Sequence, residues 1–296
     1  WWTVSKICSA ISTDLRQWQD LGTILEADPG NPWESGRILA GCTYKEKGLY
    51  YLFYPASGQG LDLKNEAISL ATSSDGCHWQ RSSHHPLVQP PDNNLWYGRC
   101  NWTGHFHWRD PYLFKDPNTG RYYMFTCASS KTPGNFQGCV GLAVADQITG
   151  PYQLLPPVLA ATSDTAADWP YYHTERPQVI FKDGKYHLFF SCFRMFLNPR
   201  WLQKVNSQRI TTSSLYWYIS DTITGPFQPA CADESIVAGS EKTGMYGTNL
   251  LKVSTDPEKF MPYGWYHRLH ALAVSPTFRA TWPSTERLTI NLDPKS

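Results

Sequence analysis

The chain has 296 residues, enough for one large domain or two ordinary ones. Charged residues make up 17% of it and aromatic residues 15%, which excludes a disordered chain, since such chains are rich in charge and poor in aromatic residues. The formal net charge is +1 and no basic run stands out, so we expect no nucleic-acid partner.

One phrase recurs four times along the chain: a short strand, a polar turn and an aromatic residue. Its marker aspartates are Asp14, Asp75, Asp146 and Asp221. Each interval between them holds three or four candidate strands and no convincing amphipathic helix. Units of that size and content are typical of the blades of a β-propeller, and the alternative is a β-sandwich with accidental similarity.

A second phrase, a turn followed by an aromatic strand, precedes the last three markers, at residues 47–54, 119–125 and 183–190. Its glycines suit the positive φ of tight hairpin turns. We therefore predict an all-β fold, a five-bladed β-propeller that forms a single catalytic domain over residues 1–296. Five blades at the mean marker spacing need more residues than the chain has, so we expect the first strands of the first blade to be absent.

Charged residues begin two of the predicted apolar strands, in Arg109-Asp110-Pro111 and Glu175-Arg176-Pro177. Proline lacks an N–H and fits the first residue of a strand. We expect the two carboxylates to occupy equivalent positions of neighbouring inner strands and to point into one central channel. Paired carboxylates with divided roles are what glycoside cleavage requires. The alternative for the first motif is a surface Arg–Asp pair before a turn.

These two motifs resemble the signatures of levansucrases and related fructosyltransferases, glycoside hydrolase family 68. The invertase and fructanase family 32 shares the first of them. The segment Asp14–Trp18 resembles the invertase phrase after the first hairpin, and Trp33-Glu34-Ser35-Gly36 resembles the stretch that lines the fructosyl site.

The resemblance implies that Asp110 stabilises the transition state, that Glu175 is the general acid/base and that Arg109 orients Asp110. Arg176 is expected to support Glu175. We expect a wider substrate-binding set, formed by Trp33, Ser35, Trp108, Arg109, His173, Arg176, Arg194 and Tyr246. Of these, Ser35 would lie beside the nucleophile, Trp108 would offer a stacking face, and Arg194 and Tyr246 would face the leaving sugar.

The sequence departs from the resembled pattern in two places. These families use an aspartate nucleophile upstream of the phrase that contains Asp14, and here no acidic residue precedes that phrase. We expect the nucleophile in an N-terminal segment outside this chain; the alternative is a non-catalytic sugar-binding propeller. His173 stands where levansucrases have a further glutamate that helps to bind the leaving sugar, so the preferred substrate need not be sucrose.

The function implied is retaining transfer of a β-fructofuranosyl unit from sucrose or a fructan to water or to another sugar. The enzymatic alternative is an arabinan- or xylan-cleaving propeller. We expect a sugar substrate, no cofactor, no metal site and a monomer. No apolar stretch approaches the roughly 20 residues of a membrane span, and no signal peptide is visible, so we expect no membrane partner and leave secreted and cytoplasmic locations open.

Overall fold

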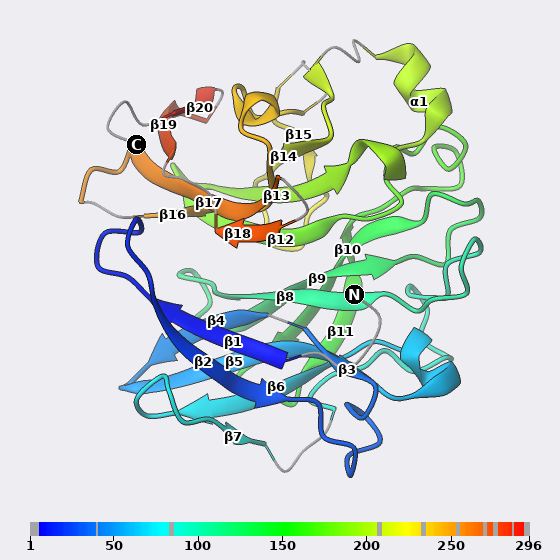
Figure 1. Ribbon diagram of the computed structural model, residues 1–296. Helices are drawn as coiled ribbons and strands as arrows, with labels where there is room; N and C mark the ends of the chain where they lie inside the picture. The colour runs from blue at the N-terminus through cyan, green and yellow to red at the C-terminus, as the bar shows by residue number, and fades with distance from the viewer. Residues whose placement is uncertain are drawn as a thin grey trace. The chain divides into compact units, whose positions relative to one another are not determined.

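The structure is a computed structural model that describes residues 6–39, 41–82, 86–205, 209–231, 235–252, 255–268, 271–274, 278–285 and 287–292. The predicted all-β class is confirmed, because most of the regular structure in the described residues is β-strand and the helices are short (Figure 1). The chain divides into two compact units: unit 1 holds residues 1–131 and 139–157, and unit 2 holds residues 132–138 and 158–296.

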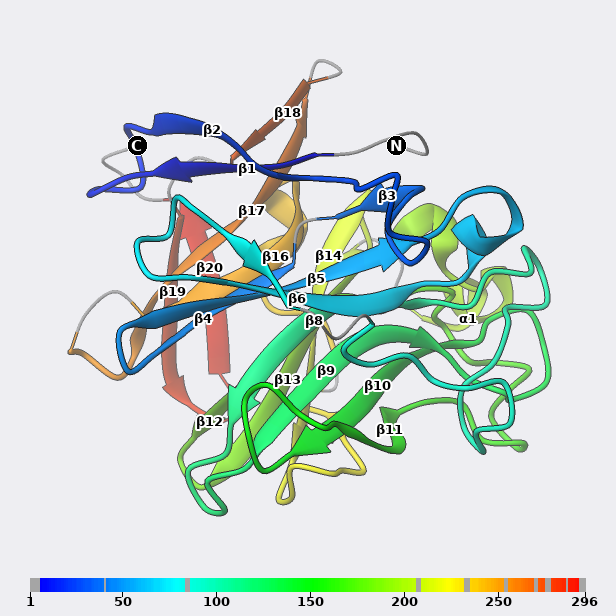
Figure 2. The same cartoon turned by 90° about the horizontal axis from the view of Figure 1, so that it is seen from below.

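Unit 1 contains a two-stranded sheet, a five-stranded sheet and most of a four-stranded sheet. The two-stranded sheet pairs β1 (Lys6–Ile11) with β2 (Gln19–Glu26). The five-stranded sheet has the order β3 (Arg37–Ile38), β5 (Leu49–Ser57), β6 (Ala67–Ser73) and β7 (Gln80–Arg81), with β4 (Cys42–Glu46) also paired to β5. The four-stranded sheet is formed by β8 (Trp108–Lys115), β9 (Tyr122–Ser129), β10 (Gly138–Ala145) and β11 (Gln153–Leu159), whose first three strands are seen side by side in Figure 2.

Unit 2 contains two sheets. One is formed by β12 (Glu175–Lys182), β13 (Lys185–Phe193), β14 (Ser213–Ser220) and β15 (Gln228–Pro229). The other is formed by β16 (Met245–Leu251), β17 (Lys259–Arg268), β19 (Phe278–Ser284) and β20 (Arg287–Leu292), with β18 (Ala271–Val274) also paired to β17.

Helical segments are short. The α-helix α1 covers Pro199–Lys204, and the 3₁₀ segments η1, η2 and η4 cover Gly60–Lys64, Arg194–Phe196 and Ser240–Lys242. Within the described ranges, no helix has the length and hydropathy needed to cross a bilayer.

The recurring turn lies where the marker aspartates predict it, after β1, β6, β10 and β14 and before the following strand. At Asp75 the carboxylate Oδ1 accepts hydrogen bonds from the backbone N–H groups of Cys77 and His78, both at 2.8 Å. At Asp14 it accepts from Arg16 at 2.8 Å and Gln17 at 2.9 Å. At these two turns the aspartate bonds to its own backbone. Asp146 and Asp221 instead form ion pairs with Arg121 and Lys185.

The aromatic hairpins also form as predicted. Lys47 and Gly48 have φ of 48° and 82°, and Asp183 and Gly184 have φ of 53° and 77°. Two consecutive residues with positive φ define the tight turn whose twist matches that of its strands. Gly120 supplies the same freedom between β8 and β9, with φ of 72°.

The predicted number of five blades is wrong, since the described residues form four blade-like sheets of four or five strands and one two-stranded sheet. The prediction counted the hairpin of β1 and β2 as a blade because it carries the first marker. Residues 27–36, which follow it, form turns and bends around Pro29, Gly30 and Pro32, so no third strand extends this sheet from that side.

Each unit has an apolar core that spans more than one sheet. In unit 1, Ile7 and Leu25 of the two-stranded sheet pack with Ile38, Leu52 and Tyr54 of the next sheet. In unit 2, both sheets contribute to one cluster of buried side chains: Phe189, Leu215, Trp217, Val237, Met245, Leu250, Phe260, Phe278, Ala280, Trp282, Leu288 and Ile290. Much of the aromatic content of the sequence is therefore used for packing between sheets.

Candidate functional site

The strands β8, β12 and β16 share one local distortion near their first residues. In β8, Arg109 pairs with Cys127 but Tyr112 pairs with Phe125, so β8 has one residue more than its partner strand. The same shift occurs in β12 between Glu175 and Gln178. It occurs again in β16 between Tyr246 and Asn249. A β-bulge of this kind re-aims the side chains beside it and is common next to active sites.

The bulge gives the next residue of each strand a positive φ: 53° at Asp110, 54° at Arg176 and 60° at Gly247. This conformation is unusual for residues other than glycine and needs support from its surroundings. The alignment of the bulges also corrects the prediction that Asp110 and Glu175 hold equivalent positions. Glu175 is equivalent to Arg109, and Asp110 to Arg176, because each carboxylate occupies a different place in its three-residue motif.

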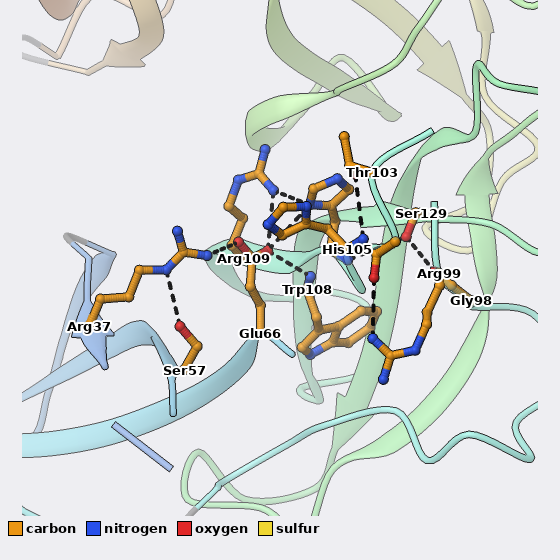
Figure 3. A network of polar contacts seen from close by, with 12 residues as sticks. Arg37, Ser57, Glu66, Gly98, Arg99, Thr103, His105, Trp108, Arg109 and Ser129 are labelled. Carbon is orange, nitrogen blue, oxygen red and sulfur yellow. Dashed lines mark hydrogen bonds and ion pairs between the residues drawn. The ribbon is translucent and has the colours of Figure 1, made fainter. Parts of the chain in front are cut away.

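A buried carboxylate organises the region around Arg109 in unit 1 (Figure 3). Glu66 Oε1 accepts a hydrogen bond from Arg37 Nη2 at 2.7 Å, and Oε2 accepts one from Arg109 Nη1 at 3.2 Å. Oε2 also accepts from the backbone N–H of Trp108 at 3.1 Å. The Glu66 and Arg37 side chains are each 4% exposed, so this is an interior ion-pair network.

The charges of this network follow from its contacts. Burial by itself raises the pKa of Glu66, but Arg109, His107 and Arg37 together hold that pKa well below its usual range. Burial and then the Arg109 charge lower the pKa of His107 to about 4. His107 is therefore neutral near pH 7, and its Nδ1 accepts a hydrogen bond from Arg109 Nη1 at 2.6 Å. Two guanidinium groups thus share one carboxylate, and that of Arg109 also donates to one neutral imidazole.

Two buried histidines make the stability sensitive to acid. Burial is the main cause that lowers the pKa values of His107 and of His187, a residue of β13, from 6.5 to about 4. As the pH falls below about 6.5, the histidines take up protons in the unfolded chain before they do so in the folded protein. The free energy of unfolding therefore decreases between about pH 6.5 and 4, by on the order of 3 kcal/mol per histidine. Urea unfolding at pH 7.5, 5.5 and 4.5 measures this loss.

The control for this prediction is His78, which is exposed and whose pKa is raised by its hydrogen bond to Asp75. His187→Gln should flatten the pH dependence, whereas His78→Gln should not flatten it. An unfolding free energy that stays constant from pH 7 to 4.5 in the unsubstituted protein would contradict the prediction.

The remaining predicted site residues of unit 1 lie in different surroundings. Trp33 is 40% exposed and lines a pocket of about 410 Å³ together with Asp62, Asn65, Asp92 and Arg99. Ser35 Oγ donates a hydrogen bond to the Pro32 carbonyl at 3.4 Å, and Ser35 is not among the residues that line this pocket.

Trp108 is fully buried, and its ring meets the Tyr97 ring edge-on, with 4.9 Å between the ring centroids. Its burial does not support the predicted stacking against a sugar, which stays a prediction. The observed role of Trp108 is packing, and its backbone N–H adds a hydrogen bond to Glu66.

In unit 2, Glu175 is the first residue of β12, is partly buried and pairs with Ser191 of β13. Arg176 Nη2 donates to Asn249 Oδ1 at 3.0 Å, and Asn249 Nδ2 donates to the Arg176 carbonyl at 3.4 Å. Arg176 is thereby held against β16. This agrees with a supporting position beside Glu175, although its role stays a prediction.

Aromatic rings connect the other predicted residues of unit 2. The Tyr246 ring stacks on Phe193, with 3.8 Å between centroids and 10° between planes. Phe193 also contacts Phe196, whose ring meets that of His173 edge-on at 4.9 Å. Arg194, between the two phenylalanines in sequence, donates from Nη1 to the Ile210 carbonyl at 2.5 Å. The structure thus brings His173 and Tyr246 to one aromatic cluster, while the Arg194 side chain bonds to the Ile210 carbonyl.

The sequence analysis missed Glu66 and Arg37. A signal for Glu66 was present, because it directly precedes the apolar strand β6, much as Arg109 is the second residue of β8 and Glu175 the first residue of β12. Asp110 belongs to unit 1 and Glu175 to unit 2, and their convergence on one channel stays a prediction.

Known proteins similar to this chain are carbohydrate-active enzymes. The family described as "Glycosyl hydrolases family 32 N-terminal domain" matches residues 7–138. The levansucrase of Rahnella aquatilis is 28% identical over 252 residues, which are 75% of this chain and 52% of that protein. The levansucrase of Erwinia amylovora is 29% identical over 254 residues, 76% of this chain and 56% of that protein. The chain thus spans about half the length of these relatives.

Solved structures show the same fold. The inulosucrase of Halalkalicoccus jeotgali bound to kestose covers 97% of this chain with a TM-score of 0.73 at 21% identity, and this chain covers 77% of it. The levansucrase of Bacillus subtilis covers 94% of this chain with a TM-score of 0.67 at 13% identity, and this chain covers 74% of it.

The fold and the motifs define an all-β protein built from β-propeller blades. A buried charged network contacts the arginine of its Arg-Asp-Pro bulge. Within that class the chain is similar to levansucrases and to the family 32 glycosyl hydrolases, and the resemblance predicted from its motifs is confirmed.

Proposed function

We propose that the natural protein is a retaining enzyme that transfers a β-fructofuranosyl unit from sucrose or a fructan to water or to another sugar. One observation carries most of this proposal. Arg109, Glu175 and Tyr246, three residues predicted from the sequence to act on substrate, occupy the same bulge position in β8, β12 and β16. Repetition of that geometry at three positions predicted to be functional is more than sheet packing requires. The levansucrase and inulosucrase relatives support the same reaction class.

The proposed mechanism is a double displacement. Glu175 protonates the leaving oxygen in the first step and activates the acceptor in the second. Asp110 stabilises the positive charge that develops on the fructosyl ring, and Arg109 orients Asp110. The reaction also needs an attacking carboxylate, and no motif in this sequence supplies one. We propose that the blades act as a single catalytic domain and as a monomer, without a cofactor.

The pocket of unit 1 is suited to a sugar ring. Trp33 offers an apolar aromatic face, and Asp62, Asp92 and Arg99 offer groups that pair with hydroxyls. Asn65 donates to Asp62 through Nδ2 at 3.2 Å, while its Oδ1 is buried and has no hydrogen-bond partner within the described residues.

Incubation of the natural full-length protein with sucrose tests the proposal. We expect release of glucose, with free fructose equal to glucose for hydrolysis and below glucose for transfer. Arabinan and xylan, tested in parallel, should not be cleaved. If neither sucrose nor any fructan releases a sugar, the proposed reaction is wrong.

A second candidate is a sugar-binding propeller without catalysis. The pocket favours it in one respect, since neither Arg109 nor Asp110 is among the residues that line it. In that case calorimetry should detect sugar binding that Trp33→Ala abolishes, while no substrate is turned over.

A further inference from the structure

Glu66 joins β6 to the strand that carries Asp110, and it does so through the two residues directly before Asp110. Its Oε2 accepts from the Trp108 backbone N–H at 3.1 Å and from the Arg109 side chain at 3.2 Å. We propose that Glu66 is a positioning residue for the reaction: it fixes Arg109 and the bulge, and thereby the direction in which Asp110 is presented. This inference rests on the proposed function.

The bulge at Asp110 needs such support. Asp110 has φ of 53° and precedes Pro111, whose ring restricts the backbone before it to extended conformations. A residue held outside its preferred region keeps that conformation only where neighbouring groups determine it. Trp108 and Arg109 are both anchored to one oxygen atom of Glu66, so the chain enters the bulge from a fixed position.

The position of the Arg109 side chain is also fixed by more than one partner. Its Nη1 donates to Glu66 Oε2 and to His107 Nδ1, the second at 2.6 Å. The Arg109 side chain is 10% exposed and that of Glu66 is 4% exposed, so water competes little for these bonds. Two buried acceptors, one of them charged, hold a guanidinium more rigidly than a surface ion pair does.

Arg37 provides a matched control within the same network. It meets the other oxygen of Glu66, Oε1, at 2.7 Å and donates from Nε to Ser57 Oγ at 3.1 Å. Its side chain is as buried as that of Glu66, at 4% exposure each. Replacing either residue removes one buried charge, but only the replacement of Glu66 alters the group that accepts from Arg109 and Trp108.

The test uses the natural full-length protein with Glu66→Gln and Arg37→Gln. We expect Glu66→Gln to lower kcat for glucose release from sucrose about 100-fold, with KM changed less than about threefold, because positioning acts mainly on the transition state. Arg37→Gln should lower kcat less than about fivefold at a comparable loss of melting temperature. Equal kcat losses in the two variants would overturn the inference.

Two further measurements keep the test decisive. If Glu66→Gln does not fold, Glu66→Asp should still lower kcat more than Arg37→Gln does, and an equal or smaller effect overturns the inference. A crystal structure of a folded Glu66 variant should show that Asp110 has left φ near 53°; an unchanged bulge overturns the inference whatever the activity. An inactive unsubstituted protein would instead contradict the proposed reaction, and this structural measurement still decides the role of Glu66.

Discussion

Glu175→Gln in the natural full-length protein should slow the release of glucose from sucrose by about 1,000-fold, within the range that general acid–base catalysis contributes. Glutamine has nearly the same shape, so the pairing of Glu175 with Ser191 at the start of β12 should persist. What is lost is the proton that the leaving oxygen needs. Initial rates of glucose release, measured at the pH optimum, give the size of the effect.

A substrate with a different leaving group distinguishes the loss of the proton donor from general damage to the site. A fructosyl donor whose leaving group needs no protonation, such as fructosyl fluoride, should react with Glu175→Gln far closer to the normal rate in the first step. Glu258→Gln is the matched control, since Glu258 is exposed and outside the proposed site. If Glu175→Gln keeps the full rate on sucrose, the assignment of the general acid is wrong.

Asp110→Asn should lower the rate on sucrose by about 100- to 1,000-fold, as the removal of one preorganised electrostatic group does in other enzymes. Asparagine is the informative replacement because it tolerates positive φ, so the bulge at φ of 53° can persist without the charge. The melting temperature should therefore change little while kcat falls. Steady-state kinetics on sucrose, with thermal unfolding alongside, measure both.

Asp183→Asn is a close control for that experiment. Asp183 has the same φ of 53°, but it lies in the exposed hairpin turn between β12 and β13. The two substitutions make the same chemical change in the same backbone conformation, and only the one at Asp110 should affect the rate. An Asp110→Asn protein with normal kcat would rule out a role for its charge.

Local signals in the sequence predicted the strands, turns and motif positions well. Asp75 ties its own turn, and Asp183-Gly184 forms a tight hairpin, because the cause of each lies within a few residues. Those signals identify strands with Arg109 or Glu175 near the first residue, since a charge before an apolar run is visible in the sequence. The family resemblance then supplied the roles, which the structure leaves as predictions.

Features that depend on distant residues were not predictable in this way. Glu66 lies 29 residues from Arg37 and 43 residues from Arg109. The three meet only because β3 and β6 pair with β5 on its two sides and β8, from the next sheet, packs against β5 and β6. The predicted number of blades was wrong for a related reason. A repeated turn marks a pair of strands, but whether further strands join that pair depends on the chain around it, as the sheet of β1 and β2 shows.

A side-chain amide of one sheet of unit 2 bonds to the backbone of the other sheet. The Gln178 side chain donates to the Leu250 carbonyl at 2.9 Å and accepts from the Leu250 N–H at 2.7 Å, so an amide of β12 replaces a ladder partner for β16. Leu250 also belongs to the core that both sheets share. Neither sheet can open without exposing the other, so unit 2 should behave as one cooperative folding element, in which the slowest-exchanging amide protons of β12 and β16 report the same opening event.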